Sequence, residues 1–491
     1  MVEALARKLD RPVRWVATRS EDGHTTGQAH GAELDLEVAA DSEGVLCGVR
    51  GRALMDIGAY VGRGANQALN YASHIVSAYH LPALGLEVES RFSTGPPAAH
   101  IRGGGRPVGN FAVERMLDRV ARRLGIDPVE LRRRNLIQPG DMPFDTGFPD
   151  QVYDGGDYPR LLDQACERAG VAEIRRLQQA GEPLGFGLAM CVESTGIGLP
   201  ESSRVRVLPD GSALAVMGST PQGQGHQTFV AQVVAERLGW DLDRVEVRVG
   251  DSRDGLRSAV TAGSRSALEL GNSAALSATA LRRRLLERAA ELLEADSADL
   301  ELSPSGATVR GAPGRGVPLA ELVGPDGLEA TEVWDSKGAK AWASSCHAAV
   351  VRVDVETGAV EMVRYVIAHD SGRSINPLLL EGQLQGGYAH GLGYALFEEA
   401  VYREDGSFAS PSFLDYTIVS APEVSCEPEL IHSETASSQN PEGFRGVGEA
   451  GTIAVPAAVA NAVEDALYHL GHEVAVTEVP ITPERLLNLI S

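Results

Sequence analysis

Hydrophobic and polar residues alternate with a period of two in two separate parts of the chain. The first part runs from His30 to Tyr60, where AELDLEVA and VLCGVRGRAL flank the turn ADSEG. The second, HAAVVRVDVETGAVEMVRYVIAHD, runs from His347 to Asp370 around an acidic-glycine turn. This period predicts a β-hairpin in each place. The shared order of histidine, strand, turn and strand favours two structurally related halves, although hairpins also resemble one another by coincidence.

A period of 3.6 predicts helices elsewhere, and some of them have recognisable ends. NFAVERMLDRVARRLG is closed by Gly125, and Asp127, Pro128 and Glu130 supply the cap, the first-turn proline and the acid that start the next helix. The first sixteen residues predict an amphipathic helix that leads into a strand. Further helices are expected at 159–169, up to 238, at 273–295 and at 456–470, and strands at 204–207, 213–217 and 245–249. This alternation predicts an α+β fold with mixed sheets.

The length of the chain predicts more than one domain. A chain of 491 residues exceeds one ordinary core, so roughly two to four domains or subdomains are expected. The segment 138–156 is rich in Pro, Gly and Asp, which indicates a linker. We place a domain boundary near 181–185, which divides the chain into residues 1–182 and 183–491.

Composition excludes several classes of function. A formal net charge of −23 repels nucleic acids and acidic membranes, so no broad surface for either is expected. No uninterrupted apolar run is long enough to span a bilayer. The five cysteines are scattered without a C-x-x-C pair, which excludes a zinc or iron–sulfur cluster built from neighbouring ligands, and no metal ligand is assigned. Their odd number and wide spacing favour reduced thiols in the cytoplasm, and the N-terminus lacks the pattern of an export signal.

Several glycine-rich loops can carry chemistry, because backbone N–H groups in such loops bind anions and cofactors. Arg102 and Arg106 stand beside three glycines, where they can clamp a carboxylate or form a structural salt bridge. Gln224 can recognise a heterocycle, whereas His226 has no spaced partner ligands and is typical of a cap or a packed ring. The loops lie at 95–110, 219–229, 261–272, 369–377 and 381–393.

Glu449 stands in the most distinctive loop, GVGEAGTIAVPAAVANAV, from Gly446 to Val463. Glycines flank the carboxylate, and Pro456 suits the first turn of the apolar helix that follows. A carboxylate on a backbone that can approach a ligand closely indicates chemistry. The alternative is a solvated glutamate at a glycine-rich helix start.

Eight motifs follow one another along the chain: IRGGGRP, NFAVERMLDRVARRLGIDPVELRRRNLI, VYDGGDYP, PQGQGHQT, TAGSRS, DSGRSINPLLLEGQLQGG, GVGEAGTI and TPERLL. In this order the chain resembles the molybdenum-binding large subunit of the xanthine dehydrogenase/aldehyde oxidase family, including the type found in bacterial three-subunit hydroxylases. The resemblance extends over essentially the whole chain. It implies two related molybdopterin-binding domains, with 1–182 as the C-terminal part of the first and 183–491 as the second.

The resemblance implies an oxidoreductase that hydroxylates an aldehyde or an N-heterocycle with water as the oxygen source. Its cofactor would be molybdenum on molybdopterin, with the cytosine dinucleotide form favoured, and a 2Fe-2S cluster and FAD on partner subunits would receive the electrons. Glu449 matches the family's general base, and Arg102 matches an arginine near the substrate. The residues that match the family's cofactor-binding segments are Gly223, Gln224, Gly225, Ala262, Gly263, Ser264 and Gln383.

Some features depart from the family pattern. Gly103 stands where aerobic carbon monoxide dehydrogenases carry a copper-binding cysteine, which argues against that activity. Gly104 stands where xanthine-type enzymes place a stacking phenylalanine, which weakens a purine assignment. The family's preceding domain, with its glycine-phenylalanine-glycine loop, falls before Met1. We therefore expect either a separate N-terminal half as a partner chain or an internal methionine of a longer protein, and an incomplete site in this chain alone. The alternatives are a non-catalytic or truncated cofactor-binding remnant and a phosphate-handling transferase.

Overall fold

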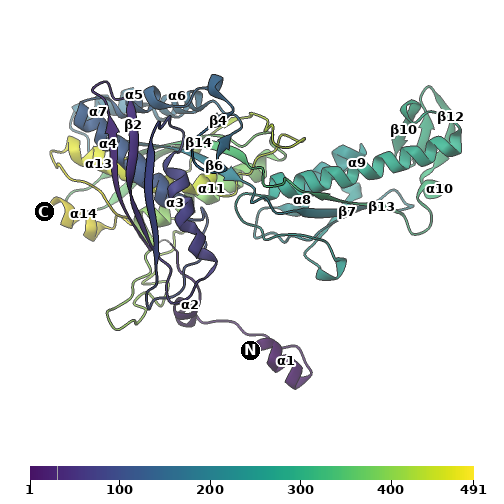
Figure 1. Ribbon diagram of the computed structural model, residues 1–491, viewed down its shortest axis with the longest axis horizontal. Coiled ribbons are helices and arrows are strands. Elements are labelled where there is room, and N and C mark those ends of the chain that lie inside the picture. The colour runs from purple at the N-terminus through teal and green to yellow at the C-terminus, as the bar shows by residue number, and fades with distance from the viewer. Residues whose placement is uncertain (30) are drawn as a thin grey trace.

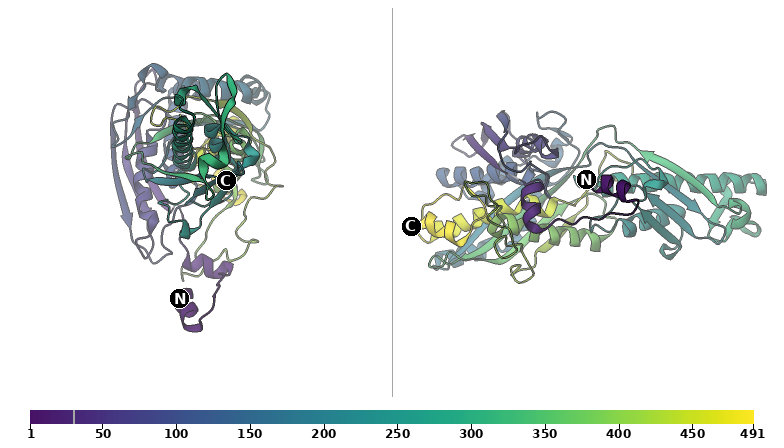
Figure 2. Two further views of the ribbon diagram at one scale, coloured as in Figure 1. Left: turned by 90° about the vertical axis from the view of Figure 1, so that its right-hand side faces the viewer. Right: turned by 90° about the horizontal axis from the view of Figure 1, so that it is seen from below.

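The computed structural model describes residues 1–29 and 31–491. It has a larger lobe, built from both end regions of the chain, and a smaller lobe built from the middle of the chain (Figure 1). The first helix, α1 (Val2–Leu9), projects from the body of the molecule (Figures 1 and 2). His30, where the first predicted hairpin begins, lies outside the described residues.

A mixed sheet forms the centre of the larger lobe, with the strand order β16-β15-β14-β6. Strand β14 pairs antiparallel with β6 and β15, and β16 lies parallel to β15. Every residue of β6 is buried, as expected for a strand with a nearly continuous apolar sequence and helices on both faces. The strands are β6 (Leu184–Thr195), β14 (Ala341–Val353), β15 (Val360–Asp370) and β16 (Glu429–Ser433).

The two faces of this sheet belong to different hydrophobic clusters. Leu188 and Met190 on β6 pack with α4 (Arg106–Leu124) and α6 (Tyr158–Ala169). Ala189, on the other face, packs with α11 (Pro377–Leu392) and α13 (Val455–His469). Helix α13 lies so close to β6 that a Cβ at Gly187 would be 2.2 Å from the carbonyl oxygen of Ala458. This close approach requires glycine.

An outer sheet with the order β1-β2-β3 covers one side of the larger lobe. Strands β1 and β2 are antiparallel, and β3 lies parallel to β2 after the connecting helix α3. Helix α3 packs against α4, which carries the candidate site at its first turn. The elements are β1 (Ala32–Ala40), β2 (Leu46–Asp56), α3 (Gln67–Ile75) and β3 (Leu84–Arg91).

The smaller lobe contains a sheet with the order β13-β7-β8-β9, packed against α8 and α9. A second sheet, β10-β11-β12, lies with α10 toward the far end of α9 (Figure 1). The elements are β7 (Glu201–Val207), β8 (Ala213–Met217), α8 (His226–Leu238), β9 (Val245–Val249), α9 (Ser266–Leu293), β10 (Leu300–Ser303), β11 (Gly306–Val309), β12 (Ala312–Pro318), α10 (Leu319–Val323) and β13 (Leu328–Trp334).

Shorter elements connect these parts. They are α2 (Arg19–Thr25), η1 (Arg63–Asn66), α5 (Pro128–Asn135), η2 (Pro139–Asp141), β4 (Phe144–Asp145), β5 (Val152–Tyr153), α7 (Val171–Gln179), η3 (Leu242–Arg244), η4 (Ser252–Asp254), η5 (Ser297–Asp299), the π-helix η6 (Gly393–Phe397), α12 (Ala450–Ile453) and α14 (Pro483–Ile490). Within the described part of the chain, no helix combines the length and apolarity needed to cross a bilayer.

The predicted α+β class and both hairpins are confirmed, the first over its described residues. Each hairpin continues through a helix to a third strand parallel to its second, and the set β7, β8, α8 and β9 repeats this order. The strand predicted after α1 is wrong, because residues 11–18 form no strand and Trp15 is 62% exposed rather than paired in a sheet. The boundary placed near 181–185 spans the connection after α7 and the first residues of β6, and it stays a prediction.

Candidate active site

A run of three glycines shapes the turn before α4. Residues 103–105 have φ of 102°, 57° and 87°, a region that residues with a Cβ rarely adopt. The turn places Arg102 just before α4 and Arg106 in its first turn. It also directs the N–H of Gly103 toward Glu449, whose Oε1 accepts this hydrogen bond at 3.2 Å. Two cationic side chains and a backbone donor are thus brought to one place.

Glu449 lies where segments distant in sequence meet. Its Oε2 accepts a charge-assisted hydrogen bond from the guanidinium of Arg106, while its Oε1 accepts the hydrogen bond from the N–H of Gly103. Its backbone N–H donates to the Ser264 hydroxyl at 3.0 Å. The Glu449 side chain is still 14% exposed. A carboxylate that is held on both oxygens and yet remains reachable has the geometry of a general base.

The glycines before Glu449 allow two loops to touch. A Cβ at Gly446 would be 1.6 Å from the Ser264 carbonyl oxygen, whereas a Cβ at Gly448 would be 3.5 Å from the Ser264 hydroxyl. The buried guanidinium of Arg445 fixes the start of the loop, because it donates to the carbonyl of Trp342 at 2.5 Å. Close backbone contact therefore explains the glycine at position 446.

Arg102 links the Glu449 loop to α11. Its Nε donates to the carbonyl of Gly448 at 2.6 Å, and its Nη2 donates to the backbone oxygen of Gln383 at 2.9 Å and to the side-chain oxygen at 3.3 Å. Burial lowers the pKa of Arg102, and the nearby charge of Glu449 opposes this. Arg102 therefore fixes two segments of the site and supplies positive charge beside the Glu449 carboxylate.

Glu193 on β6 adds a second carboxyl group that was not among the predicted site residues. Its Oε1 accepts a hydrogen bond from the Ser264 hydroxyl and lies 3.6 Å from Nη1 of Arg106. Nη2 of Arg106 also donates to the carbonyl of Ser194 at 3.0 Å. The signal in the sequence is a single acidic residue inside the apolar run GLAMCVEST.

Burial dominates the protonation of Glu193. It raises the pKa of Glu193 to about 7; Glu449 adds to this rise, whereas Arg106 and the Ser264 hydroxyl oppose it. Burial also lowers the pKa of Arg106, but the charges of Glu449 and Glu193 outweigh burial, so the pKa is raised and the guanidinium stays charged. One charged guanidinium thus serves two carboxyl groups.

The predicted cofactor-binding segment 262–264 lies beside this cluster. Ser264 has φ of 49° and contacts both Glu449 and Glu193 through its hydroxyl. The next residue, Arg265, is fully buried and pairs with Glu201 at 2.9 Å. This buried ion pair anchors the segment at the start of α9.

The predicted segment 223–225 lies at the start of α8. Gly223 and Gly225 have φ of 112° and 71°, and Gln224 accepts a hydrogen bond from the N–H of Gln222 at 2.6 Å. Among the described residues, neither ring nitrogen of the buried His226 has a hydrogen-bond partner. The segment approaches α11 through Leu379, whose side chain would lie 2.8 Å from a Cβ at Gly225.

The structure therefore joins four predicted site residues into one cluster. They are Arg102, Gln383, Ser264 and Glu449. Arg102 contacts Gln383, Ser264 contacts Glu449, and the carbonyl of Gly448 links the two pairs through Arg102. Within residues 1–29 and 31–491, no hydrogen bond or ion pair links Gln224 to Glu449. Ala262 is exposed beside the cluster.

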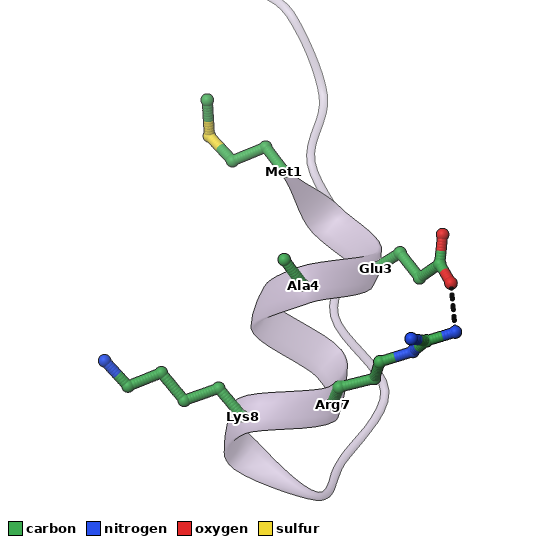
Figure 3. Close-up of a pocket in the computed structure, with 5 residues that line it drawn as sticks. All are labelled: Met1, Glu3, Ala4, Arg7 and Lys8. Carbon is green, nitrogen blue, oxygen red and sulfur yellow. Dashed lines mark ion pairs between the residues drawn. The ribbon is translucent and has the colours of Figure 1, made fainter.

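A separate hollow of about 620 Å³ lies along α1 (Figure 3). Its lining comes from one exposed helix, in which Glu3 pairs with Arg7 at 2.7 Å. No residue of α1 is buried. Because no polar group from another described segment converges there, this hollow does not have the character of an active site.

The loops around Glu449 fit a phosphate-bearing pterin cofactor. Helices α8 and α9 start without a side-chain cap from any described residue, so their first backbone N–H groups are available to phosphate oxygens. The neutral amides of Gln224 and Gln383 suit the donors and acceptors of a heterocycle. In the part of the chain that the structure describes, no group of three or more His, Cys, Asp and Glu side chains is placed to hold a metal ion.

Sequence comparison agrees with this fit. A profile of the molybdopterin cofactor-binding domain matches residues 161–425, and a second profile with the same description matches residues 1–136. The fold and the site thus define a protein of the molybdopterin-binding class. More narrowly, the chain belongs to the xanthine dehydrogenase/aldehyde oxidase family, as a molybdopterin-binding large subunit.

Individual relatives resemble this chain along nearly its whole length. The nicotine 6-hydroxylase large subunit of Paenarthrobacter nicotinovorans is 33% identical over 99% of this chain and 63% of that protein. Subunit gamma of the 6-hydroxypseudooxynicotine dehydrogenase complex from the same organism is 32% identical over 98% of this chain and 63% of that protein. The structure of quinoline 2-oxidoreductase from Pseudomonas putida 86 superposes with a TM-score of 0.91 at 32% identity, covering 99% of this chain and 65% of that chain. This chain therefore spans less than two thirds of these relatives.

Proposed function

We propose that this chain forms part of a molybdenum hydroxylase that oxidises an aldehyde or an N-heterocycle, with water as the oxygen source and Glu449 as the general base. The observation that carries this proposal is the Glu449 carboxylate, held by Arg106 and Gly103 and only 14% exposed, at the meeting point of the predicted cofactor loops. Such a carboxylate can take a proton from an attacking oxygen nucleophile without rearranging.

The residues around Glu449 have separate tasks in this mechanism. Segments 223–225 and 262–264 and the side chain of Gln383 would hold the molybdenum–pterin group, whose chemistry is to accept two electrons from the substrate. Gly103 and Arg106 keep the carboxylate oriented. Arg102, whose guanidinium is fixed by Gly448 and Gln383, would stabilise negative charge that develops on the substrate.

The relatives support the substrate class and the need for partners. One relative is named a nicotine 6-hydroxylase and another a quinoline 2-oxidoreductase. A third is a subunit of a dehydrogenase complex. We propose that electrons leave through a 2Fe-2S subunit and an FAD subunit, and that the pterin carries a cytosine dinucleotide. Free thiols support a location in the cytoplasm; they belong to Cys47, Cys166, Cys191, Cys346 and Cys426.

The triple-glycine turn supports a narrower choice of substrate. A Cβ at Gly103 would lie 2.7 Å from the ring of Pro107, so a metal-binding thiol there would require Pro107 to shift. A Cβ at Gly104 would make only ordinary contacts, 3.7 Å from Asn70 and His100. Gly104 itself adds no side chain to this part of the site. This favours a substrate bulkier than carbon monoxide and bound without a stacking phenylalanine from this position.

The test replaces Glu449 with glutamine in the complex assembled with its partner subunits. Glu449→Gln keeps the shape of the side chain but removes its basicity, so turnover should fall about 10²–10⁴-fold. Molybdenum and pterin contents, measured on the same samples, should not change. The exposed Glu473→Gln serves as the matched control and should keep full turnover.

Near-normal turnover of Glu449→Gln with the cofactor bound would show that Glu449 is not the base. The remnant alternative makes a different prediction. In that case the chain would bind neither molybdenum nor pterin, alone or with its partner subunits, although it folds.

A further inference from the structure

One guanidinium lies between two carboxyl groups in the candidate site. Arg106 donates to Oε2 of Glu449 through Nη1, and the same Nη1 lies 3.6 Å from Oε1 of Glu193. Glu193 is 1% exposed, so water cannot solvate it as it can solvate Glu449. Within the described residues, Oε2 of Glu193 has no hydrogen-bond partner. A buried, ionised carboxylate oxygen without a hydrogen-bond partner destabilises the folded chain, whereas a protonated carboxyl group avoids most of this free-energy cost.

The elements packed around Glu193 supply few further charges. From α4 and the turn before it come Arg106 and, farther away, Arg102; from the loop before α12 comes Glu449. The loop before α9 supplies the neutral Ser264 hydroxyl, and Cys191 on the same strand stays a neutral thiol because burial raises its pKa. The hydrogen bonds of Arg102 go to Gly448 and Gln383 rather than to Glu193. Two ionised carboxylates would therefore compete for the single guanidinium of Arg106.

We propose that Glu193 is a positioning residue for Glu449: Glu193 holds a proton, so that Arg106 pairs with Glu449 alone and keeps that carboxylate oriented. The proposal rests on the role proposed above for Glu449. Burial raises the pKa of Glu193 to about 7, with Glu449 adding to the rise and Arg106 and Ser264 opposing it. Loss of the Glu193 proton to solvent would turn Arg106 partly toward Glu193 and loosen its hydrogen bond to Glu449.

The first test needs neither cofactor nor partners. Infrared spectra of the whole chain, with 13C-labelled glutamate carboxyls, are recorded across the pH range for the wild type and for Glu193→Gln. We expect the C=O band of a protonated carboxyl that titrates near pH 7 in the wild type and is missing from Glu193→Gln. The exposed Glu246→Gln on β9 is the control and should keep the band. If wild type and Glu193→Gln titrate alike, Glu193 holds no such proton and the proposal is wrong.

A second variant guards against misfolding of Glu193→Gln. Ser264→Ala removes the hydroxyl that donates to Glu193 and stabilises its ionised form. The midpoint of the infrared band should therefore move to higher pH. A midpoint that stays in place or moves to lower pH would contradict the assignment of the band to Glu193.

The third measurement separates positioning from a purely structural role. In the assembled complex, the plot of log(kcat/KM) against pH should show an inflection near pH 7 that Glu193→Gln abolishes while it keeps turnover within about tenfold. An unchanged profile would refute the link between Glu193 and the base even if the infrared band exists. Failure of the proposed function appears elsewhere, as full turnover of Glu449→Gln.

Discussion

Substitution of Gly446 by alanine tests the contact on which the position of Glu449 depends. The new Cβ would lie 1.6 Å from the carbonyl oxygen of Ser264, whereas ordinary contacts begin at 3.4 Å. The difference, about 1.8 Å, must be taken up by movement of one loop, since the opposing atom belongs to the backbone and cannot rotate away. The same Ser264 holds the backbone N–H of Glu449 and the carboxyl group of Glu193.

Both stability and turnover should respond to this movement. Overpacking of this kind costs about 1–3 kcal/mol, which should lower the melting temperature of the chain. A displacement of about 1 Å at a reacting group costs on the order of 10²-fold in rate, so Gly446→Ala should lose at least that factor in kcat in the assembled complex. Molybdenum content must be measured alongside, so that loss of cofactor is not mistaken for loss of alignment.

Gly448→Ala is the matched control, two residues away in the same loop. Its Cβ would lie 3.5 Å from the Ser264 hydroxyl, an ordinary contact, so its melting temperature should stay close to that of the wild type. Its turnover should fall far less than that of Gly446→Ala. If both variants melt and turn over alike, the two loops are not in the contact described here, and the explanation of the glycine at 446 is refuted.

Two further predictions concern buried charge. Arg132→Met leaves the buried carboxylates of Glu114 and Asp118 without their cation and should lower the free energy of unfolding in urea by about 3–5 kcal/mol. The control is Arg133→Met, whose ion pairs are exposed and whose loss should cost less than about 1 kcal/mol. Equal losses in the two variants would contradict this prediction. The pKa of Glu193 is higher in the folded chain than its ordinary 4.5. Its contribution to the free energy of unfolding is therefore fully present below about pH 4.5 and is lost as the pH rises to about 7. Relative to wild type, Glu193→Gln should therefore gain stability between these pH values, up to on the order of 3 kcal/mol, and a constant difference across this range would disprove it.

Local sequence signals predicted many of the helices and strands in this fold. Strict alternation around ADSEG located β1 and β2, and the Asp127 cap located α5, because both signals depend on residues within a few positions of one another. The prediction of a strand after α1 was wrong because it used local signals alone. Residues 11–18 have strand-like composition, but a strand also needs an edge to pair with, and the sequence does not show which edges are free.

The candidate site could be predicted only in part, because its contacts are long-range. Arg102, Gln383, Ser264 and Glu449 were recognisable from motifs. The ion pair between Arg106 and Glu449 joins residues 343 positions apart, and the hydrogen bond between Ser264 and Glu193 joins residues 71 positions apart. The pairing register of β6 with β14 turns Glu193 toward this cluster. A shift of that register by one residue would turn its side chain to the opposite face of the sheet.

The cluster around Glu449 also bears on how the two lobes depend on each other. Gly103 and Arg106, which hold the carboxylate, belong to the larger lobe. Ser264, which holds the backbone of Glu449, lies two residues before the long helix of the smaller lobe. The Glu449 side chain and backbone are therefore both held only when the two lobes are packed in this arrangement. A boundary near 181–185 would separate Arg106 from Glu449, so independent folding of 1–182 and 183–491 would give two pieces, neither of which contains the paired carboxylate. This placement makes the lobe junction, rather than either lobe alone, the structural unit that carries the proposed chemistry.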